Sequence, residues 1–404
     1  MKFSGKFWRA LGVTVLASAL LATSFVATPS YAVPSYPTWS EVQAAKKSVT
    51  KKRALIARFN EILRTQLKEE DKLSRVALQL GEKYNVAKQQ LQEISAKVAT
   101  LQAQADVANE QANDAKSRLA QIASQMYRNG SAGTSVSLLL NAGQADNLLY
   151  QLGARDRLAV QNDTTYRKAV EKQRYAQSVT DQLNVAKQDM KAKAKLAKES
   201  YDKAAGAANA LSSKIDANRT LQDTFYAQLA VLQRTSADLE RRRAEGIAAE
   251  VRQNNGNAGS VLTAPSLYTV KDADPEVVRN VLAFARAQRG DNYVFGGAGM
   301  NVWDCSGLTM TTYKKAGGIY ISWHSVVAQF RLSAQRKQLV PMRDRQPGDL
   351  LFYTTSSAFD GDKYHITIYS GNNNMLEAPR PGTVVREVPM RWGELFPYAA
   401  RPSA

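Results

Sequence analysis

The only cysteine of the chain, Cys305, lies in a setting that suits a thiol nucleophile. A single cysteine closes no internal disulfide, so its possible roles are an incidental buried thiol, an intermolecular bridge or a nucleophile. Asp304 is a good helix N-cap before a helix that we expect to run to about Lys315, which puts Cys305 in the first turn. Because the positive end of a helix stabilises thiolate, we expect a lowered pKa for this thiol, and the sequence favours the nucleophile.

A cysteine nucleophile needs a base, and the chain has two histidines, His324 and His365. His365 begins an alternating segment typical of a strand, and after a turn at 370–374 the returning strand places Glu377 opposite or diagonal to it on the same face. A carboxylate there could hold the imidazole tautomer and stabilise the imidazolium, the third role in a triad. The alternatives are an ordinary half-buried strand histidine and a solvated edge glutamate.

The second histidine, His324, falls in a segment that reads as a loop before a helix. We interpret it as structural or substrate-proximal and not as the base. Two histidines and one cysteine, far apart in the sequence, lack the spacing of zinc ligands, so we expect neither a metal nor another cofactor.

The formal net charge of +18 and a pI of about 9.8 predict attraction to polyanions. The basic residues are spread among Glu and Gln, without an aromatic-interleaved basic patch, which argues against nucleic-acid binding. For an exported chain, an anionic cell wall or membrane surface is the better partner.

Export is indicated by residues 1–32, which have the features of a secretory signal peptide. Lys2, Lys6 and Arg9 precede an apolar run over 10–27, and small side chains follow at the expected cleavage positions. An uncleaved membrane anchor is the alternative, because the run is near the lower length limit of a spanning helix. Lipoprotein attachment is excluded, since it needs a cysteine at the cleavage site.

Residues 33–253 form the first predicted folding unit, which is rich in Ala, Gln, Lys, Leu and Glu. Apolar residues recur every seven positions in two rows before Asn129 and in one row after it, a pattern typical of a coiled coil. Two such arms in one chain most simply fold back as an antiparallel hairpin, and an intermolecular coil is the alternative. The rows are Leu73, Leu80, Ala87, Ile94, Leu101, Ala108, Ala115 and Ile122, then Tyr84, Leu91, Val98, Ala105, Ala112, Leu119 and Met126, and finally Leu183, Met190, Ala197, Ala204 and Leu211.

The tip of this hairpin, at about 130–160, carries more apolar residues than a turn needs. It could be a small helical cap packed on itself or a docking lobe for a partner, since exposed apolar patches often mark interfaces. The residues that we single out for such a lobe are Leu138, Leu139, Leu148 and Leu149.

Beyond the helical unit, residues 254–274 begin with an Asn- and Gly-rich stretch that predicts a linker. Residues 275–404 are richer in Gly, Pro, Tyr, Trp and Val and form the second folding unit. We therefore expect an α+β chain in which a long antiparallel helical unit precedes a domain containing a sheet.

Four blocks of the second unit resemble, in order, those of the NlpC-type cysteine peptidases, which have a papain-like core and cut the stem peptides of bacterial peptidoglycan. Together with the coiled coil, the chain is similar to the actinobacterial RipC-type endopeptidases. The resemblance covers about 275–398, and its combination of blocks is specific. The blocks are YVFGG at 293–297, DCSGL at 304–308, QPGDL at 346–350 and HITIY at 365–369.

The resemblance implies Cys305 as the nucleophile, His365 as the base and Glu377 in the orienting position, which is often His in the family. It also implies that Tyr293 donates a hydrogen bond to the developing oxyanion. Asp304 and Ser306 flank the nucleophile and could contact substrate, although helix capping explains them equally well. The implied reaction is hydrolysis of the bond between D-isoglutamate and the third stem residue, meso-diaminopimelate.

The sequence around the tip resembles a further feature of secreted wall hydrolases controlled by the FtsEX division complex. In that group a lobe at this place binds the extracellular loop of FtsX, and the coiled coil restrains the catalytic domain. The resemblance implies peptidoglycan as substrate and FtsX as partner. Two other functions stay open: a non-enzymatic division regulator that activates another hydrolase, and a wall amidase with the same nucleophile. The segments that carry this resemblance are QMYRNG at 125–130, SLLL at 137–140 and DNLL at 146–149.

Overall fold

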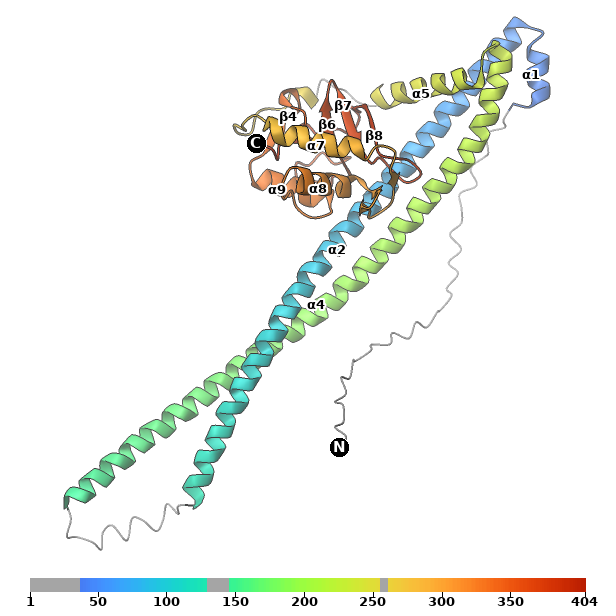
Figure 1. Ribbon diagram of the computed structural model, residues 1–404. Coiled ribbons are helices and arrows are strands. Elements are labelled where there is room, and N and C mark those ends of the chain that lie inside the picture. The colour runs from blue at the N-terminus through green and yellow to red at the C-terminus, as the bar shows by residue number, and fades with distance from the viewer. Residues whose placement is uncertain (1–36, 129–144, 255–260) are drawn as a thin grey trace, which may run out of the picture.

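The computed structural model describes residues 37–128, 145–254 and 261–404, which form a long helical pair and an α+β domain packed on it (Figure 1). The predicted α+β organisation, helices first and sheet domain second, is confirmed. The predicted signal peptide, together with Leu138 and Leu139, lies outside the described residues, and the side chains of Leu148 and Leu149 are not described either. Among the described residues, no helix combines the length and apolar character needed to cross a membrane.

The helical unit begins with the short helix α1 (Trp39–Ala45), which starts at a capping box formed by Thr38 and Glu41. The helices α2 (Val49–Arg128) and α4 (Ala145–Gln233) follow and pack against each other, but they diverge toward the end far from α1 (Figure 1). Helix α5 (Ala237–Asn254) then turns back toward the sheet domain (Figure 1). At 1.5 Å per residue, α2 is about 120 Å long.

The pair is antiparallel, because early residues of α2 pack against late residues of α4. Phe59 meets Phe225 with ring centroids 5.1 Å apart, and further along α2 Leu101 shares a buried cluster with Leu183. The predicted seven-residue rows are partly at this interface, since eight of their twenty residues are buried: Ala87, Leu101, Ala105, Ala108, Leu183, Ala197, Ala204 and Leu211. Leu73 is an exception and is 36% exposed.

The sheet domain contains a six-stranded sheet with the order β4-β9-β5-β6-β7-β8, in which neighbouring strands are antiparallel. A small three-stranded sheet, β1-β3-β2, precedes the second helix of the domain. The strands are β1 (Asn292–Tyr293), β2 (Ala298–Gly299), β3 (Val302–Trp303), β4 (Leu339–Pro341), β5 (Leu350–Tyr353), β6 (His365–Gly371), β7 (Asn374–Glu377), β8 (Arg386–Pro389) and β9 (Tyr398–Ala400), with a 3₁₀ turn at Met342–Asp344.

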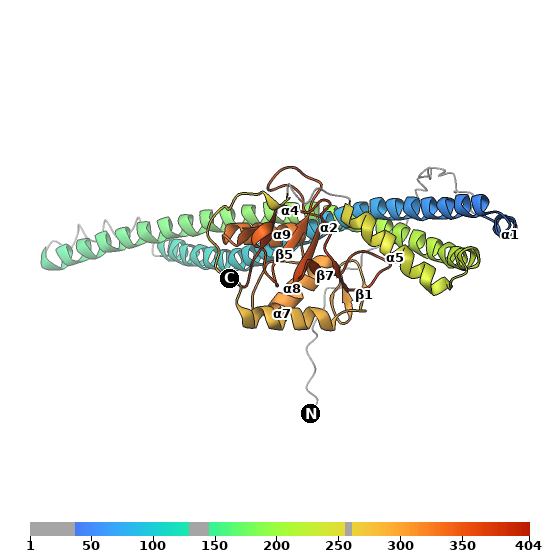
Figure 2. The ribbon, with the colours of Figure 1, turned by 90° about the horizontal axis from the view of Figure 1, so that it is seen from above.

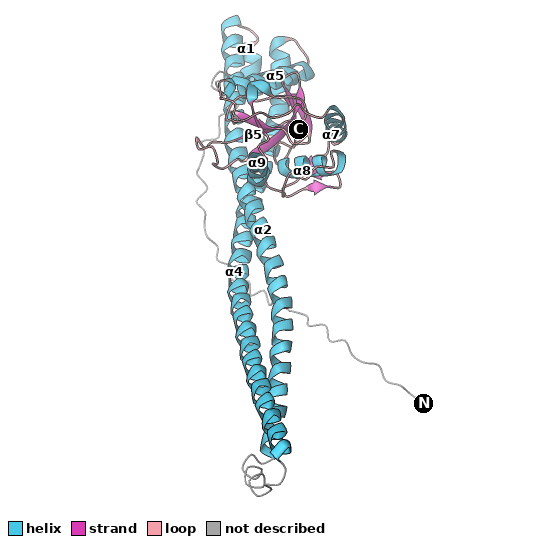
Figure 3. Cartoon of the chain, turned by 90° about the vertical axis from the view of Figure 1, so that its left-hand side faces the viewer, coloured by secondary structure: helices cyan, strands magenta, loops and turns pink. Residues whose placement is uncertain are grey.

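Three helices complete this domain: α7 (Pro275–Ala287), α8 (Cys305–Ala316) and α9 (Val326–Gln335). Their apolar faces form one core with the central strands, in which Leu350, Ile366 and Ile368 are fully buried. The domain sits on one flank of the helical pair, with α7 on the far side (Figure 2). It lies close to the end that carries α1 and α5, so the other end of the pair projects freely (Figure 3).

Within the predicted linker over 254–274, Asn254 is the last residue of α5 and residues 261–274 run along the sheet domain. Val261 and Ala264 are buried in its two main apolar clusters. The Tyr268 hydroxyl accepts a hydrogen bond from the backbone N–H of Leu339 at 3.0 Å. This segment is therefore bound to the surface of the domain over most of its described length.

Candidate active site

Cys305 is the first residue of α8, and Asp304 is the N-cap. The Asp304 carboxylate accepts hydrogen bonds from the backbone N–H of Gly307 at 2.8 Å and of Gly296 at 3.0 Å. The second bond ties the loop after β1 to the start of α8. The cap thereby fixes the turn that presents the nucleophile, and Cys305 is only 6% exposed.

His365 and Glu377 meet across the hairpin formed by β6 and β7. The register pairs Ile368 with Leu376, so Glu377 lies diagonal to His365 on the same face of the sheet. His365 Nε2 is 3.0 Å from Glu377 Oε2, and both side chains are fully buried. The predicted third position is therefore within hydrogen-bond distance of the predicted base.

Cys305 and His365, the predicted nucleophile and base, come from adjacent elements because α8 packs directly on β6. The backbone N–H of Ile366, the residue that follows His365 in β6, is close enough to the Cys305 thiol to lower its pKa. His365 Nδ1 is buried and has no hydrogen-bond partner among the described residues. With Nε2 bound to Glu377, Nδ1 is the ring nitrogen left to accept a proton.

The expectation of a lowered thiol pKa is wrong for this arrangement. Burial raises the pKa of Cys305 well above its ordinary value, and the carboxylates of Asp304 and Glu82 raise it further. The N–H groups of Ile366 and Ser306 oppose that rise without cancelling it. Cys305 is at the helix N-terminus as predicted, but the burial of the thiol and the nearby carboxylates outweigh the lowering of its pKa by the helix.

Glu377 is held as a carboxylate by two arginines that were not predicted. Burial by itself would raise the pKa of Glu377, but Arg391, Arg386 and His365 hold it well below its ordinary value. Burial also lowers the pKa of His365, and the two arginines lower it further against the opposite influence of Glu377. These shifts favour a neutral imidazole on His365 and a protonated thiol on Cys305.

The remaining predicted residues surround the nucleophile. Burial raises the pKa of Tyr293 well above its ordinary value, with added contributions from Asp304 and Cys305, so its hydroxyl stays protonated and able to donate. Ser306 is fully buried and its hydroxyl donates to Asp304 at 3.3 Å, which is a capping role. His324 Nε2 is 2.6 Å from Asp304 Oδ1, so this histidine supports the cap and does not contact Glu377.

The most important residue missed by the sequence analysis is Glu82 of α2. Its carboxylate accepts a hydrogen bond from the Ser325 hydroxyl at 2.5 Å and from the backbone N–H groups of Val326 and Val327 at 2.9 Å each. Ser325 is the N-cap of α9, so Glu82 occupies the positive end of that helix. No signal in the sequence marks Glu82, because it is one polar residue among many on a long helix.

Apolar contacts hold the same stretch of α2 against the domain. Leu78 belongs to a buried cluster of the sheet domain, and Phe295 packs against Gly81, where a Cβ atom would lie only 3.0 Å from its ring. The Phe295 ring is also flanked by Tyr84 of α2 and Tyr201 of α4, with centroids 5.3 and 6.1 Å away. Phe295 therefore contacts both long helices.

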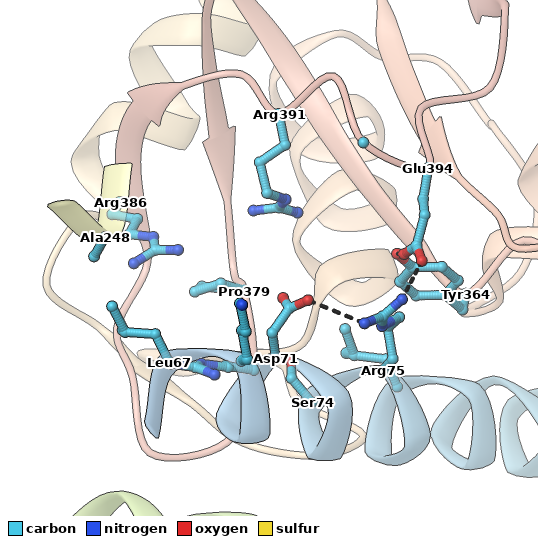
Figure 4. A pocket seen from close by; sticks show the side chains of 14 residues that line it. Leu67, Asp71, Ser74, Arg75, Ala248, Tyr364, Pro379, Arg386, Arg391 and Glu394 are labelled. Carbon is cyan, nitrogen blue, oxygen red and sulfur yellow. Dashed lines mark hydrogen bonds and ion pairs between the residues drawn. The ribbon is translucent and has the colours of Figure 1, made fainter. Parts of the chain in front are cut away.

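Ion pairs complete the interface around a cavity of about 380 Å³ between α2 and the domain (Figure 4). Arg75 binds both Asp71, at 3.2 Å, and Glu394 of the domain. Arg380 of the domain donates to Glu70 at 3.0 Å. Helix α2 is thus fixed to the domain by charged, polar and apolar contacts together.

Comparison with known proteins agrees with this geometry. Residues 290–393 match the NlpC/P60 family. That range contains Cys305, His365 and Glu377, and the NlpC/P60 match covers the part of the chain that holds the site. It leaves the long helices outside.

Similar proteins include the peptidoglycan endopeptidase RipA of Mycobacterium tuberculosis, 30% identical over 208 residues, which are 48% of this chain and 37% of RipA. The peptidoglycan endopeptidase RipB of the same species is 27% identical and covers 46% of this chain and 76% of RipB. The chain thus spans little more than a third of RipA. Among solved structures, the NlpC/p60 domain of the peptidoglycan hydrolase SagA is 28% identical with a TM-score of 0.27, over 30% of this chain and 97% of that one.

Proposed function

We propose that the chain is a cysteine peptidase that hydrolyses peptidoglycan stem peptides. The observation that carries the proposal is the buried His365–Glu377 pair beside Cys305 at the start of α8. The NlpC/P60 match over 290–393 and the similarity to named peptidoglycan endopeptidases support it. Within this class we propose the bond between D-isoglutamate and meso-diaminopimelate, as the family resemblance implies.

The chemistry follows from the protonation states. His365 Nδ1 takes the proton of the Cys305 thiol as sulfur bonds to the substrate carbonyl carbon, and Glu377 stabilises the imidazolium. Tyr293 and the backbone N–H of Cys305 donate to the oxyanion. His365 then gives its proton to the leaving amine as the C–N bond breaks. Water, deprotonated by His365, attacks the thioester and releases the acid and the thiol.

A digest of purified peptidoglycan, read by mass spectrometry, tests this reaction. We expect products cut after D-isoglutamate, and we expect Cys305→Ala to abolish them. Products lacking the whole stem peptide would indicate an amidase with the same nucleophile. Undiminished cutting by Cys305→Ala would overturn the nucleophile, and no cutting by residues 261–404 alone would favour a non-enzymatic regulator.

We also propose that the helical pair is a coiled coil that restrains the enzyme. Glu82, Leu78 and Gly81 bind α2 over the domain next to Cys305, and the charge of Glu82 opposes thiolate formation. Residues 261–404 have their own core, so this domain can be prepared alone. We expect it to cut peptidoglycan faster than the full chain, whereas equal rates would contradict restraint.

The proposed setting is the bacterial cell wall during daughter-cell separation, reached through the predicted signal peptide. The proposed partner is the extracellular loop of FtsX, bound at the tip around 130–160, which the motifs at 125–130, 137–140 and 146–149 support. We expect that loop to raise the activity of the full chain. We expect no such activation of a variant that combines Leu148→Glu with Leu149→Glu. Activation of the double variant to the same extent would remove FtsX from this surface.

A further inference from the structure

Glu377 has more partners than a histidine-orienting carboxylate needs. Besides its contact with His365, its Oε1 atom accepts hydrogen bonds from Arg386 Nε at 3.0 Å and Nη2 at 2.8 Å. Arg391 Nη1 donates to both oxygens, at 3.0 Å to Oε1 and 2.8 Å to Oε2. One fully buried carboxylate therefore serves two guanidinium groups and one imidazole.

The fold brings both arginines to Glu377 from the same side of the sheet domain. Arg386 stands directly opposite Glu377 in the pairing of β7 with β8. Arg391 follows β8 and stacks over the ring of Tyr353 at 4.7 Å. Tyr353 is itself paired with His365 across β5 and β6. The two arginines, Glu377, Tyr353 and His365 thus form one connected group on adjoining strands.

The arginines also separate the buried carboxylate from solvent. The Arg386 and Arg391 side chains are 28% and 20% exposed and line the cavity that faces α2 (Figure 4), whereas Glu377 is fully buried. Their two positive charges exceed the single negative charge between them. His365 therefore faces a carboxylate that is already satisfied, inside a cluster that carries a net positive charge.

We propose that Arg391 and Arg386 are positioning residues that keep Glu377 ionised and hold His365 as a neutral imidazole, protonated on Nε2, with Nδ1 free to take the thiol proton. The inference rests on the proposed function only in naming that proton as the one on Cys305. A glutamate beside a histidine raises the pKa of the ring and so favours the imidazolium, which has no free nitrogen to accept the thiol proton. The second and third charges prevent this, because they occupy the carboxylate and repel a further positive charge.

The two histidines of the chain make the inference directly measurable. In a protein labelled with ¹⁵N-histidine, His324 and His365 give two sets of imidazole signals, and His324→Gln assigns them. We expect His365 in the full chain to be neutral at pH 6.5, with Nε2 protonated and Nδ1 bare. A charged His365 at this pH, or a proton on Nδ1, would overturn the inference.

The decisive variant is Arg391→Met, which removes one cation and keeps an unbranched side chain. We expect the pH at which His365 gains its second proton to shift upward. Arg391→Lys should bring the titration of His365 most of the way back to that of the wild type, since it returns the positive charge. Arg289→Met is the matched control, because Arg289 pairs with Glu387 at 3.4 Å and does not contact Glu377. It should leave His365 unchanged.

A purely structural role for Arg391 gives a different result, in which Arg391→Met leaves the titration and the tautomer of His365 as they were. That outcome would overturn the inference. If Arg391→Met does not fold, Arg386→Met is measured in its place, with a smaller upward shift expected, and the absence of a shift would contradict the inference. The measurement uses no substrate, so failure to cut peptidoglycan and failure of the arginine pair are separate results.

Discussion

The Glu82 carboxylate of α2 lies 2.5 Å from the Ser325 hydroxyl at the start of α9, although 243 positions separate the two residues. The same carboxylate accepts from the backbone of Val326 and Val327. An acid from the helical unit thus fills the positive end of a helix of the sheet domain, and its charge raises the pKa of Cys305. One side chain contributes both a contact and an electrostatic effect to the closed state.

Removing this acid should expose the nucleophile. We expect Glu82→Ala to accelerate alkylation of Cys305 in the full chain at pH 6 by about tenfold or more, since it removes three hydrogen bonds to the start of α9, each worth about 0.5–1.5 kcal/mol. Intact mass after iodoacetamide treatment measures the rate without ambiguity, because Cys305 is the only cysteine. Glu110→Ala, an exposed acid further along α2, should react like the wild type. Equal rates for both variants would remove Glu82 from the restraint.

The closed state should weaken as pH rises through 7. Burial raises the pKa of Glu82 to about 7 from 4.5, with Asp304 adding to the rise and the bonds from Ser325, Val327 and Val326 opposing it. Because the pKa of Glu82 is higher in the docked state, protonation of Glu82 stabilises docking. This contribution is complete below pH 4.5, is lost by about pH 7, and amounts to on the order of 3 kcal/mol in docking free energy. Cys305 and His324 also face Glu82, and its negative charge contributes to raising the pKa of each.

The ratio of alkylation rates, Glu82→Gln over wild type, checks this dependence between pH 5.5 and 8.5. The glutamine amide of this variant does not titrate. We expect the ratio to fall as pH rises, because the wild type opens and the variant does not respond to pH in this way. A ratio independent of pH would show that ionisation of Glu82 does not control docking.

The contact between Gly81 and Phe295 should be sensitive to side-chain size. A Cβ atom at Gly81 would lie 3.0 Å from the Phe295 ring, so Gly81→Leu should displace α2 and speed alkylation of Cys305. Gly206→Ala in α4 is the control, since a Cβ atom there meets nothing within 4 Å. It should stabilise the helix by about 0.5–1 kcal/mol without changing alkylation. Slower alkylation in Gly81→Leu would contradict the predicted displacement.

The stability of the sheet domain should depend on the buried pair of Asp349 and Arg401. Arg401 donates to both Asp349 oxygens at 3.0 Å, and burial raises the pKa of Asp349 to about 6 despite this partner. Arg401→Met should cost about 3–5 kcal/mol in unfolding free energy, because it leaves a buried acid unpaired. Urea denaturation measures this, and Arg289→Met, at an exposed pair, should cost under about 1 kcal/mol. Similar losses for both variants would argue that burial is not the cause.

Local patterns explain what could be predicted. The Asp304 cap and the start of α8 follow from residue types, and the hairpin turn after His365 constrains where Glu377 must lie. Arg386 was within reach of the same reasoning, since continuing the strand pairing from β7 to β8 places it opposite Glu377. The two long helices likewise follow from apolar periodicity.

The features that could not be predicted from the sequence depend on contacts between segments that are far apart in the chain. Glu82 and Ser325 are each ordinary polar residues, and only the folded chain brings them together. The raised thiol pKa has the same origin, because Glu82 and the burial of Cys305 both come from the packing of α2 over the domain. Leu73 continues an apolar row and is still 36% exposed, since the register of α2 on α4 is decided by the whole interface.

The Phe295 ring packs against both Tyr84 and Tyr201, which also contact each other with ring centroids 5.3 Å apart, so the packing of Phe295 depends on the spacing between the two helices. Tyr84 belongs to α2 and Tyr201 to α4, so Phe295 would lose its contact with one of these rings if the two helices separated at this level. Phe295 is two residues beyond Tyr293, and the adjoining Gly296 is bonded to the Asp304 cap. If α2 and α4 twist or separate, the change would therefore be transmitted through the Phe295 side chain to α8, the helix that begins at Cys305.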